Sequence, residues 1–231
     1  MPQRSSWIGA EWRDGRRFSM SDLSLRFTTQ RTAIVLWVVI SFCAQIWAQP
    51  APDASSRAAF LQRLVSAAIE RTHHTVRYDG AYVRLKYPGG DVPGDTGVCT
   101  DEIIRAYRAV GVDLQKEVHE DMTANFAVYP RKWHRSSPDS NIDHRRVPNL
   151  MVFFARKGET LAITGRTEDY RPGDLVTYDL GGNVPHIGIV VDRKGPSAQY
   201  MIVHNIGQGP RMEDVLFGWK ITGHYRYYGP E

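Results

Sequence analysis

The spacing of apolar residues predicts two helices in the first half of the chain. Residues 58–70 repeat apolar positions at helical intervals, and a second pattern of this kind begins at Cys99. Gly111 is a natural end for that second helix. Residues 112–150 are polar and aromatic without a sustained period, so we expect a surface excursion with one short helix there.

The second half of the chain changes to short apolar runs separated by turn residues. Gly- and Pro-containing segments at 171–174 and 193–197 read as turns. The runs between and around them predict strands at residues 150–155, 175–178, 186–191 and 199–204. Helices followed by antiparallel strands predict an α+β fold, formed by a single domain over residues 58–231.

An apolar run at residues 33–47 has the character of a secretory signal, because it is shorter than the roughly 20 residues of a membrane-spanning helix. The small residue Ala48 predicts cleavage after it, with residues 1–48 as an N-terminal extension and signal peptide. Met20 would give a more ordinary start, and residues 49–57 read as a linker. We expect export to the periplasm or the exterior, with an uncleaved leader contacting the membrane as the alternative.

Removal of the expected leader changes both the net charge and the number of cysteines in the remaining chain. Six of the 29 basic and three of the 25 acidic residues lie in residues 1–48, which leaves 23 against 22 and a formal net charge of +1. That balance gives no electrostatic reason to expect a nucleic-acid partner. Of the two cysteines, Cys43 lies in the leader, so Cys99 has no partner for a disulfide within the exported chain.

Cys99 stands at the predicted start of a helix, directly after a loop rich in glycine. Unpaired N–H groups and the helix dipole favour a thiolate there and can also bind an oxyanion, which suits a nucleophile. The other interpretation is a small buried apolar residue. Asp101 and Glu102 follow closely and oppose a thiolate, so a nucleophilic role requires a cationic partner.

Two histidines on the predicted strands can supply that partner. A hairpin of residues 186–191 and 199–204 centred on Gly195 places His186 directly opposite His204. One imidazole could then act as a base and the other could orient it. A slip of one residue would turn one histidine to the other face and make Asn205 the orienting residue.

The motifs around these residues resemble those of the NlpC/p60 superfamily of papain-like cell-wall cysteine peptidases. Segments 139–150, 186–190 and 203–207 are more closely similar to the bacterial domain of unknown function 1287. The resemblance implies a papain-like fold with Cys99 as nucleophile, His186 as general base and His204 as the third, polar member. It also matches Tyr87 to a tyrosine near the nucleophile.

A charged run follows at Asp143, His144, Arg145 and Arg146, and it could clamp a substrate carboxylate. A solvated loop with internal ion pairs is the alternative. The sequence therefore predicts an exported cysteine hydrolase of amide bonds that uses no cofactor and no metal, with peptidoglycan stem peptide or another peptide as substrate. An inactive wall-binding module and a metal-dependent hydrolase are the alternatives, although no His-Glu-x-x-His run is present.

Overall fold

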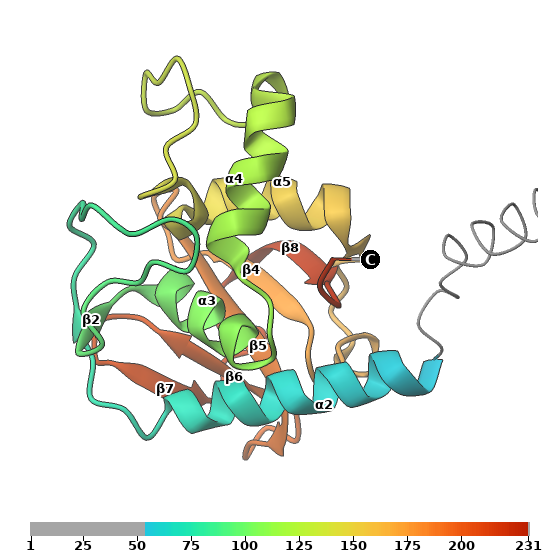
Figure 1. Ribbon diagram of the computed structural model, residues 1–231. Coiled ribbons are helices and arrows are strands. Elements are labelled where there is room, and N and C mark those ends of the chain that lie inside the picture. The colour runs from blue at the N-terminus through green and yellow to red at the C-terminus, as the bar shows by residue number, and fades with distance from the viewer. Residues whose placement is uncertain (1–53, 231) are drawn as a thin grey trace, which may run out of the picture. The chain divides into compact units, whose positions relative to one another are not determined.

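A computed structural model describes residues 54–230 of the protein (Figure 1). The expected leader, its cleavage site and the alternative start at Met20 lie outside these residues. Across residues 54–230, none of the helices combines the length and the apolar character needed to cross a membrane.

The first described helix, α2 (Ala54–Arg71), confirms the predicted helix at 58–70 and extends it. Its first four residues belong to the segment expected as a linker, so the expected boundary at residue 57 is wrong. The extension is explained by contacts from the far end of the chain. Arg57 lies 4.9 Å from the ring centroid of Tyr228 and 3.7 Å from a Glu159 carboxylate oxygen. Such long-range contacts leave no trace in local composition.

The second predicted helix is confirmed as α3 (Cys99–Ala109). The expected excursion at 112–150 holds more helix than expected, namely α4 (Leu114–Asn125) and the start of α5 (Val147–Lys157), with 3₁₀ turns at Phe126–Val128 and Asp143–Arg145. The predicted strand at 150–155 is therefore wrong. Leu150, Phe153 and Phe154 have the i, i+3, i+4 spacing of one buried helix face, and a short apolar run does not distinguish that from a strand.

The main sheet consists of β3 Glu159–Thr160, β4 Leu175–Asp179, β5 Pro185–Lys194, β6 Tyr200–Asn205, β7 Pro210–Glu213 and β8 Lys220–Arg226. All neighbouring strands pair antiparallel, in the order β3-β8-β4-β5-β6-β7. The predicted strands at 175–178, 186–191 and 199–204 are confirmed, and the other three were not expected. A separate parallel pair joins β1 (Arg77–Tyr78) to β2 (Thr96–Gly97), directly before α3. A third 3₁₀ turn covers Thr167–Asp169.

The helices cover one face of the sheet, as Figure 1 shows for α2 and α3 beside β5 and β6. On that face Ile187, Ile189 and Val203 join the main core with the apolar sides of α2, α3 and α5. Val190 and Ile202 belong to a second, smaller core on the other face. The expected α+β architecture, with Cys99 at a helix start packed on an antiparallel sheet, is confirmed.

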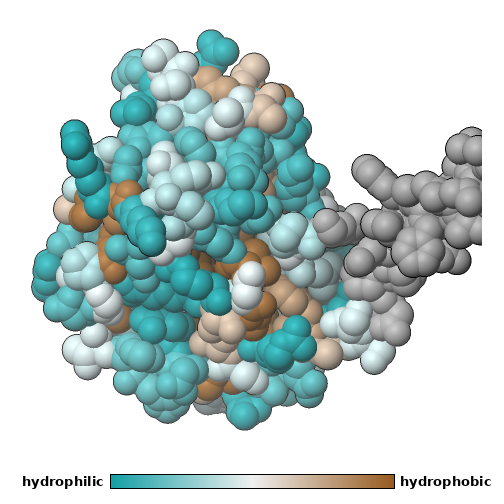
Figure 2. All heavy atoms as spheres, in the orientation of Figure 1, coloured by the Kyte–Doolittle hydropathy of each residue, from teal (hydrophilic) through white to brown (hydrophobic). Residues whose placement is uncertain are grey.

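The outer surface in the view of Figure 2 is mainly hydrophilic, with apolar residues in small separate patches. Among the described residues, the exposed large apolar side chains include Tyr78, Tyr82, Val184 and Ile206. Tyr78 pairs with Gly97, two residues before Cys99, and Val184 and Ile206 lie two residues from His186 and His204 along the chain. Val128 and Ile163 are also more than half exposed, so exposed apolar side chains are not confined to these segments.

The β5–β6 register differs from the expected one by two residues. Ile189 pairs with Val203 and Val190 pairs with Ile202, so the residue directly opposite His204 in this register is Gly188 rather than His186. Because the shift is an even number, both histidines stay on the same face of the sheet. The irregular pairing between Val190 and Lys194 explains why symmetry about the turn gave the wrong partner.

Candidate active site

Cys99 is the first residue of α3, and the β1–β2 pair holds the chain that leads into it. Tyr78 pairs with Gly97, two residues before Cys99, and the Asn205 side chain reaches the Gly97 carbonyl at 3.5 Å. Val98 precedes the helix in an extended conformation. Cys99 is free, and only 4% of its surface is exposed.

Burial sets the protonation state of the thiol. Desolvation raises the pKa of Cys99 to about 12, although hydrogen bonding from the Ile187 backbone N–H and from the first N–H groups of the helix acts in the opposite direction. The nearby Asp101 charge raises this pKa further. The N–H groups at the helix start thus favour a thiolate as expected, but burial outweighs them, and Cys99 is a neutral thiol in this state of the molecule. The contact with the Ile187 N–H nevertheless shows that the sulfur lies against the backbone of β5, directly after His186 in the chain.

The two acids expected to oppose a thiolate are both paired with arginines. Asp101 accepts from Arg145 at two oxygens, with Nε to Oδ1 at 2.8 Å and Nη2 to Oδ2 at 3.0 Å. The same carboxylate accepts the Val98 backbone N–H at 2.7 Å, which caps the helix. Glu102 accepts from Arg71 Nε at 2.8 Å. The cations that offset these charges are thus arginines.

His186 and His204 meet through their ring nitrogens. His186 Nε2 lies 2.8 Å from His204 Nδ1, so the expected contact between the two imidazoles is confirmed although they are diagonal rather than opposed. His204 Nε2 in turn lies 2.9 Å from Glu213 Oε2 on β7. Asn205 does not contact His186 in the described chain; its Oδ1 instead accepts the Gly207 backbone N–H at 3.1 Å. Of the two alternatives left open by the sequence, His204 is the residue beside His186.

Both histidines are buried and neutral. Burial, followed by the neighbouring His204, lowers the pKa of His186 to about 3. Burial also lowers the pKa of His204, although the Glu213 carboxylate acts to raise it. A neutral His186 can accept a proton at ordinary pH, whereas a charged one could not.

Aromatic rings surround the histidine pair on the second face of the sheet. The Trp219 ring centroid lies 6.0 Å from that of His186 and 5.7 Å from that of His204, in edge-on geometry. Tyr178, paired with His186 in the register of β4 and β5, lies 6.3 Å away. These rings keep water from the contact between the imidazoles, which strengthens it electrostatically.

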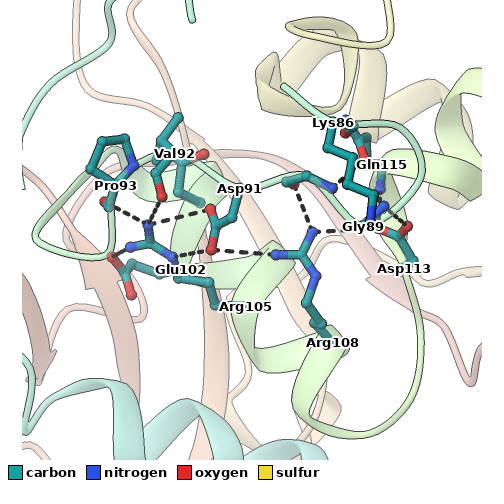
Figure 3. Close-up of polar contacts among 12 residues, drawn as sticks. Lys86, Gly89, Asp91, Val92, Pro93, Glu102, Arg105, Arg108, Asp113 and Gln115 are labelled. Atoms are coloured by element: carbon teal, nitrogen blue, oxygen red, sulfur yellow. Dashed lines mark hydrogen bonds and ion pairs between the residues drawn. The ribbon is translucent and has the colours of Figure 1, made fainter. Parts of the chain in front are cut away.

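The loop between β1 and α3 is tied to the helices by a polar network (Figure 3). Asp91 lies between the guanidinium groups of Arg105 and Arg108, at 3.0 and 3.3 Å. Arg105 Nη2 also donates to the backbone carbonyl of Thr96 at 2.9 Å. Gln115 of α4 accepts the Gly90 backbone N–H at 2.8 Å. The chain that approaches Cys99 is therefore fixed by side chains of α3 and α4.

Tyr87 lies on this loop but its described contacts are with α4. Its ring is 5.0 Å from that of His119, and 39% of its surface is exposed. Burial raises the pKa of Tyr78, and Cys99 and Asp101 raise it further. Tyr78 is therefore the tyrosine whose electrostatic environment includes Cys99. The expected neighbour of the nucleophile is thus corrected from Tyr87 to Tyr78.

The expected carboxylate clamp at residues 143–146 is largely built into the interior. Arg145 is occupied by Asp101 and by the backbone carbonyls of Ala81 and Asp79 at 2.9 and 3.3 Å, so its role as a substrate ligand is corrected to a structural one. Asp143 is buried and pairs with Arg146 at 3.1 Å.

His144 is also buried, and its Nδ1 makes no hydrogen bond within the described chain. Burial, with neighbouring cations, lowers the pKa of His144 to about 3. Arg146 is the most accessible of the four and lies 4.0 Å from the Trp133 ring centroid. The alternative of a solvated loop with internal ion pairs is wrong about the solvation, because three of the four residues are buried, but the expected internal ion pair is present between Asp143 and Arg146. No separate site for a carboxylate follows from it.

Sequence reasoning missed Glu213 and Tyr78, and it did not place Trp219 beside the two histidines. Glu213 lies on a strand that is only four residues long, β7, and Trp219 lies in the loop before β8. Tyr78 belongs to a two-residue strand. Segments this short show no period, so no local pattern in the sequence marked these residues.

Comparison with known proteins assigns the chain to a family. The model of the family described as "Domain of unknown function (DUF1287)" matches residues 65–227. The uncharacterized protein YijF of Escherichia coli (strain K12) is 50% identical over 165 residues, which cover 71% of this chain and 80% of that protein.

Solved structures with a lower similarity include NlpC2 and NlpC1 from Trichomonas vaginalis, with TM-scores of 0.41 and 0.38 and identities of 15% and 14%. A protein similar to a lipoprotein of the NLP/P60 family from Staphylococcus aureus has a TM-score of 0.35 and an identity of 17%. These matches cover 73%, 78% and 79% of this chain but only 46%, 47% and 46% of the solved chains, so the chain spans about half of their length. On the family match and the relative, the chain belongs to the domain of unknown function 1287 family.

Proposed function

We propose that the protein is a cysteine hydrolase of amide bonds, with Cys99 as nucleophile and His186 as general base. The observation that supports the proposal is that the sulfur of Cys99, at the start of α3, receives the Ile187 backbone N–H of β5, directly after His186 in the chain. The His186 ring in turn contacts His204 of β6. A buried structural cysteine requires none of these polar neighbours.

The proposed reaction begins from neutral groups. His186 takes the thiol proton as the sulfur attacks an amide carbonyl, which forms a C–S bond and places negative charge on the carbonyl oxygen. The N–H groups at the start of α3, which act on the Cys99 sulfur, would bind the oxyanion. The imidazolium then gives its proton to the leaving amine as the C–N bond breaks. Water, deprotonated by His186, hydrolyses the thioester and returns the thiol.

Peptidoglycan stem peptide is the proposed substrate and the cell envelope the proposed location. The motif resemblance around Cys99, His186 and His204 supports the first, and the signal-like run at residues 33–47 supports the second. Both follow from the sequence.

One observation favours a second candidate, an inactive module that binds the wall. Cys99, His186 and His204 are 4%, 2% and 1% exposed, so the described state gives a substrate little access to the sulfur. A hydrolase must open this region when substrate binds, whereas a binding module need not. For the metal-dependent alternative, residues 54–230 contain no group of three or more His, Cys, Asp or Glu side chains arranged so that they could hold a metal ion.

Digestion of muropeptides separates these candidates. The protein and its Cys99→Ala, Cys99→Ser and His186→Ala variants are incubated with purified muropeptides, and the products are identified by mass. We expect cleavage of an amide bond by the unaltered protein and its loss in all three variants. Binding of the muropeptides without cleavage would favour the wall-binding module, and full activity of Cys99→Ala would exclude the proposed nucleophile.

A further inference from the structure

The polar contacts of the histidine pair continue to a third strand. Glu213 stands opposite Ile202 on β7, two positions along from the residue that pairs with His204. Its carboxylate therefore shares the face of His204 and reaches His204 Nε2 at 2.9 Å. His186, His204 and Glu213 form a diagonal line across β5, β6 and β7, and the line ends at a side chain that is 36% exposed.

The chemistry of this line fixes where its protons lie. A carboxylate only accepts hydrogen bonds, so His204 Nε2 carries the proton that meets Glu213. In a neutral imidazole the other nitrogen is then an acceptor, and His204 Nδ1 must receive a proton from His186 Nε2. His186 consequently has its lone pair on Nδ1, the form that can take a proton from a thiol.

The alternative arrangement would disable the base. Without the carboxylate, His204 can adopt the other tautomer and donate from Nδ1 to His186 Nε2. His186 would then hold its proton on Nδ1 and could accept none there. Both arrangements satisfy the contact between the imidazoles, so that contact alone does not select one.

We propose that Glu213 is a positioning residue that selects the catalytic tautomer of His186 through His204. This inference rests on the proposed function, since it assigns a further residue to the same site. The other groups that adjoin His204 do not perform this role. Trp219 contacts it through its ring, and Arg211, its register partner on β7, is an exposed cation that cannot accept a proton.

The experiment reads the tautomers directly and does not depend on any substrate. The full chain is labelled with ¹⁵N-histidine, and the ring nitrogens are classified by long-range ¹H–¹⁵N correlation at pH 7. His186→Gln and His204→Gln variants assign the signals. In the unaltered protein we expect protonated Nε2 and bare Nδ1 on both histidines.

Two variants remove the carboxylate and leave no side-chain acceptor for His204 Nε2, namely Glu213→Ala and Glu213→Leu. Glu168→Gln is the matched control, because it removes one negative charge from a side chain that is 70% exposed. We expect both Glu213 variants to populate protonated Nδ1 on His204 and His186, and the control to keep the original pattern. Unchanged tautomers in a folded Glu213→Ala or Glu213→Leu variant would overturn the inference.

Kinetics with a cleaved muropeptide supply the second readout. We expect kcat to fall at least about tenfold in both Glu213 variants with KM within twofold, as for a wrongly oriented base. A fall in kcat without a change of tautomer would contradict the positioning role. Retention of full activity by Cys99→Ala would instead refute the proposed nucleophile while leaving the tautomer result to decide the role of Glu213.

Discussion

Arg145 holds Asp101 in a bidentate ion pair 44 residues away in the sequence, with both side chains almost completely buried. The pair fixes the first turn of α3 because Asp101 also accepts the Val98 N–H. Its position, two residues from Cys99, links the placement of the thiol to the stability of the fold.

Removal of Arg145 should therefore unfold the protein more readily. We expect Arg145→Met to lower the free energy of unfolding by about 3–5 kcal/mol, since it leaves the Asp101 carboxylate buried without its partner. Urea unfolding followed by circular dichroism measures the change. Arg166→Met is the matched control, with a much smaller expected loss because its side chain is 67% exposed in its ion pair with Asp169. A loss below that of the control would contradict the structural role of Arg145.

Acid should destabilise the protein through its buried histidines. The pKa values of His144 and His186 are lowered to about 3, below the unfolded value of about 6.5, so the unfolded state binds more protons between these limits. These two histidines therefore leave the free energy of unfolding unchanged above pH 6.5 and lower it as the pH falls from 6.5 toward 3. Each such histidine contributes a slope of at most about 1.4 kcal/mol per pH unit.

His144→Leu should flatten this dependence by about that amount between pH 6 and pH 4. Urea unfolding at intervals of half a pH unit provides the comparison. Between pH 7.5 and pH 9 the variant and the unaltered protein should have parallel profiles, because this histidine is neutral in both states there. A variant with the full slope below pH 6 would show that His144 is not held neutral by the fold.

Cys99 should react as a thiol with a high pKa. In a Cys43→Ser background it is the only cysteine of the chain, so alkylation by iodoacetamide reports on it alone. Because burial raises its pKa to about 12, we expect the rate to keep rising up to pH 10 without a plateau. The same protein in denaturant provides the control, with a plateau above the ordinary thiol pKa of about 8.5. Rapid alkylation below pH 7 would mean that a thiolate is favoured instead.

Gly188 lacks a side chain where Ile202 and His204 of the neighbouring strand pack closely against it. A Cβ at this position would lie 2.3 Å from Ile202 Cγ2 and 3.3 Å from His204 Cβ. We expect Gly188→Ala to cost about 1–3 kcal/mol of stability by overpacking and to reduce hydrolysis by displacing His204. Gly165→Ala is the control, because a Cβ there meets nothing within 4 Å. Equal stability of the two variants in thermal unfolding would argue against this close packing.

The sequence predicted the elements that have a clear period and the residues that end them. The helix from Cys99 and the strands that carry His186 and His204 were found because each is long enough to show its apolar pattern. The strand expected at 150–155 is part of α5 because three buried residues in a short run fit a helix as well.

The site was predicted less completely, for reasons of register and distance. His186 and His204 were correctly brought together, but the irregularity between Val190 and Lys194 moved their pairing by two positions. Glu213 could not be found, since its strand was not predicted. Arg145 was taken as a ligand because a sequence does not show that Asp101 lies against it. The buried state of Cys99 likewise depends on packing that no local pattern reveals.

The most direct test is to trap the acyl-enzyme. The protein is mixed with a muropeptide that it cleaves, quenched in acid within milliseconds to seconds, digested and mapped by mass spectrometry. The account predicts a thioester of the acyl fragment on the peptide that contains Cys99, absent from Cys99→Ala together with all turnover. An acyl group attached to another residue, or continued cleavage by Cys99→Ala, would contradict it.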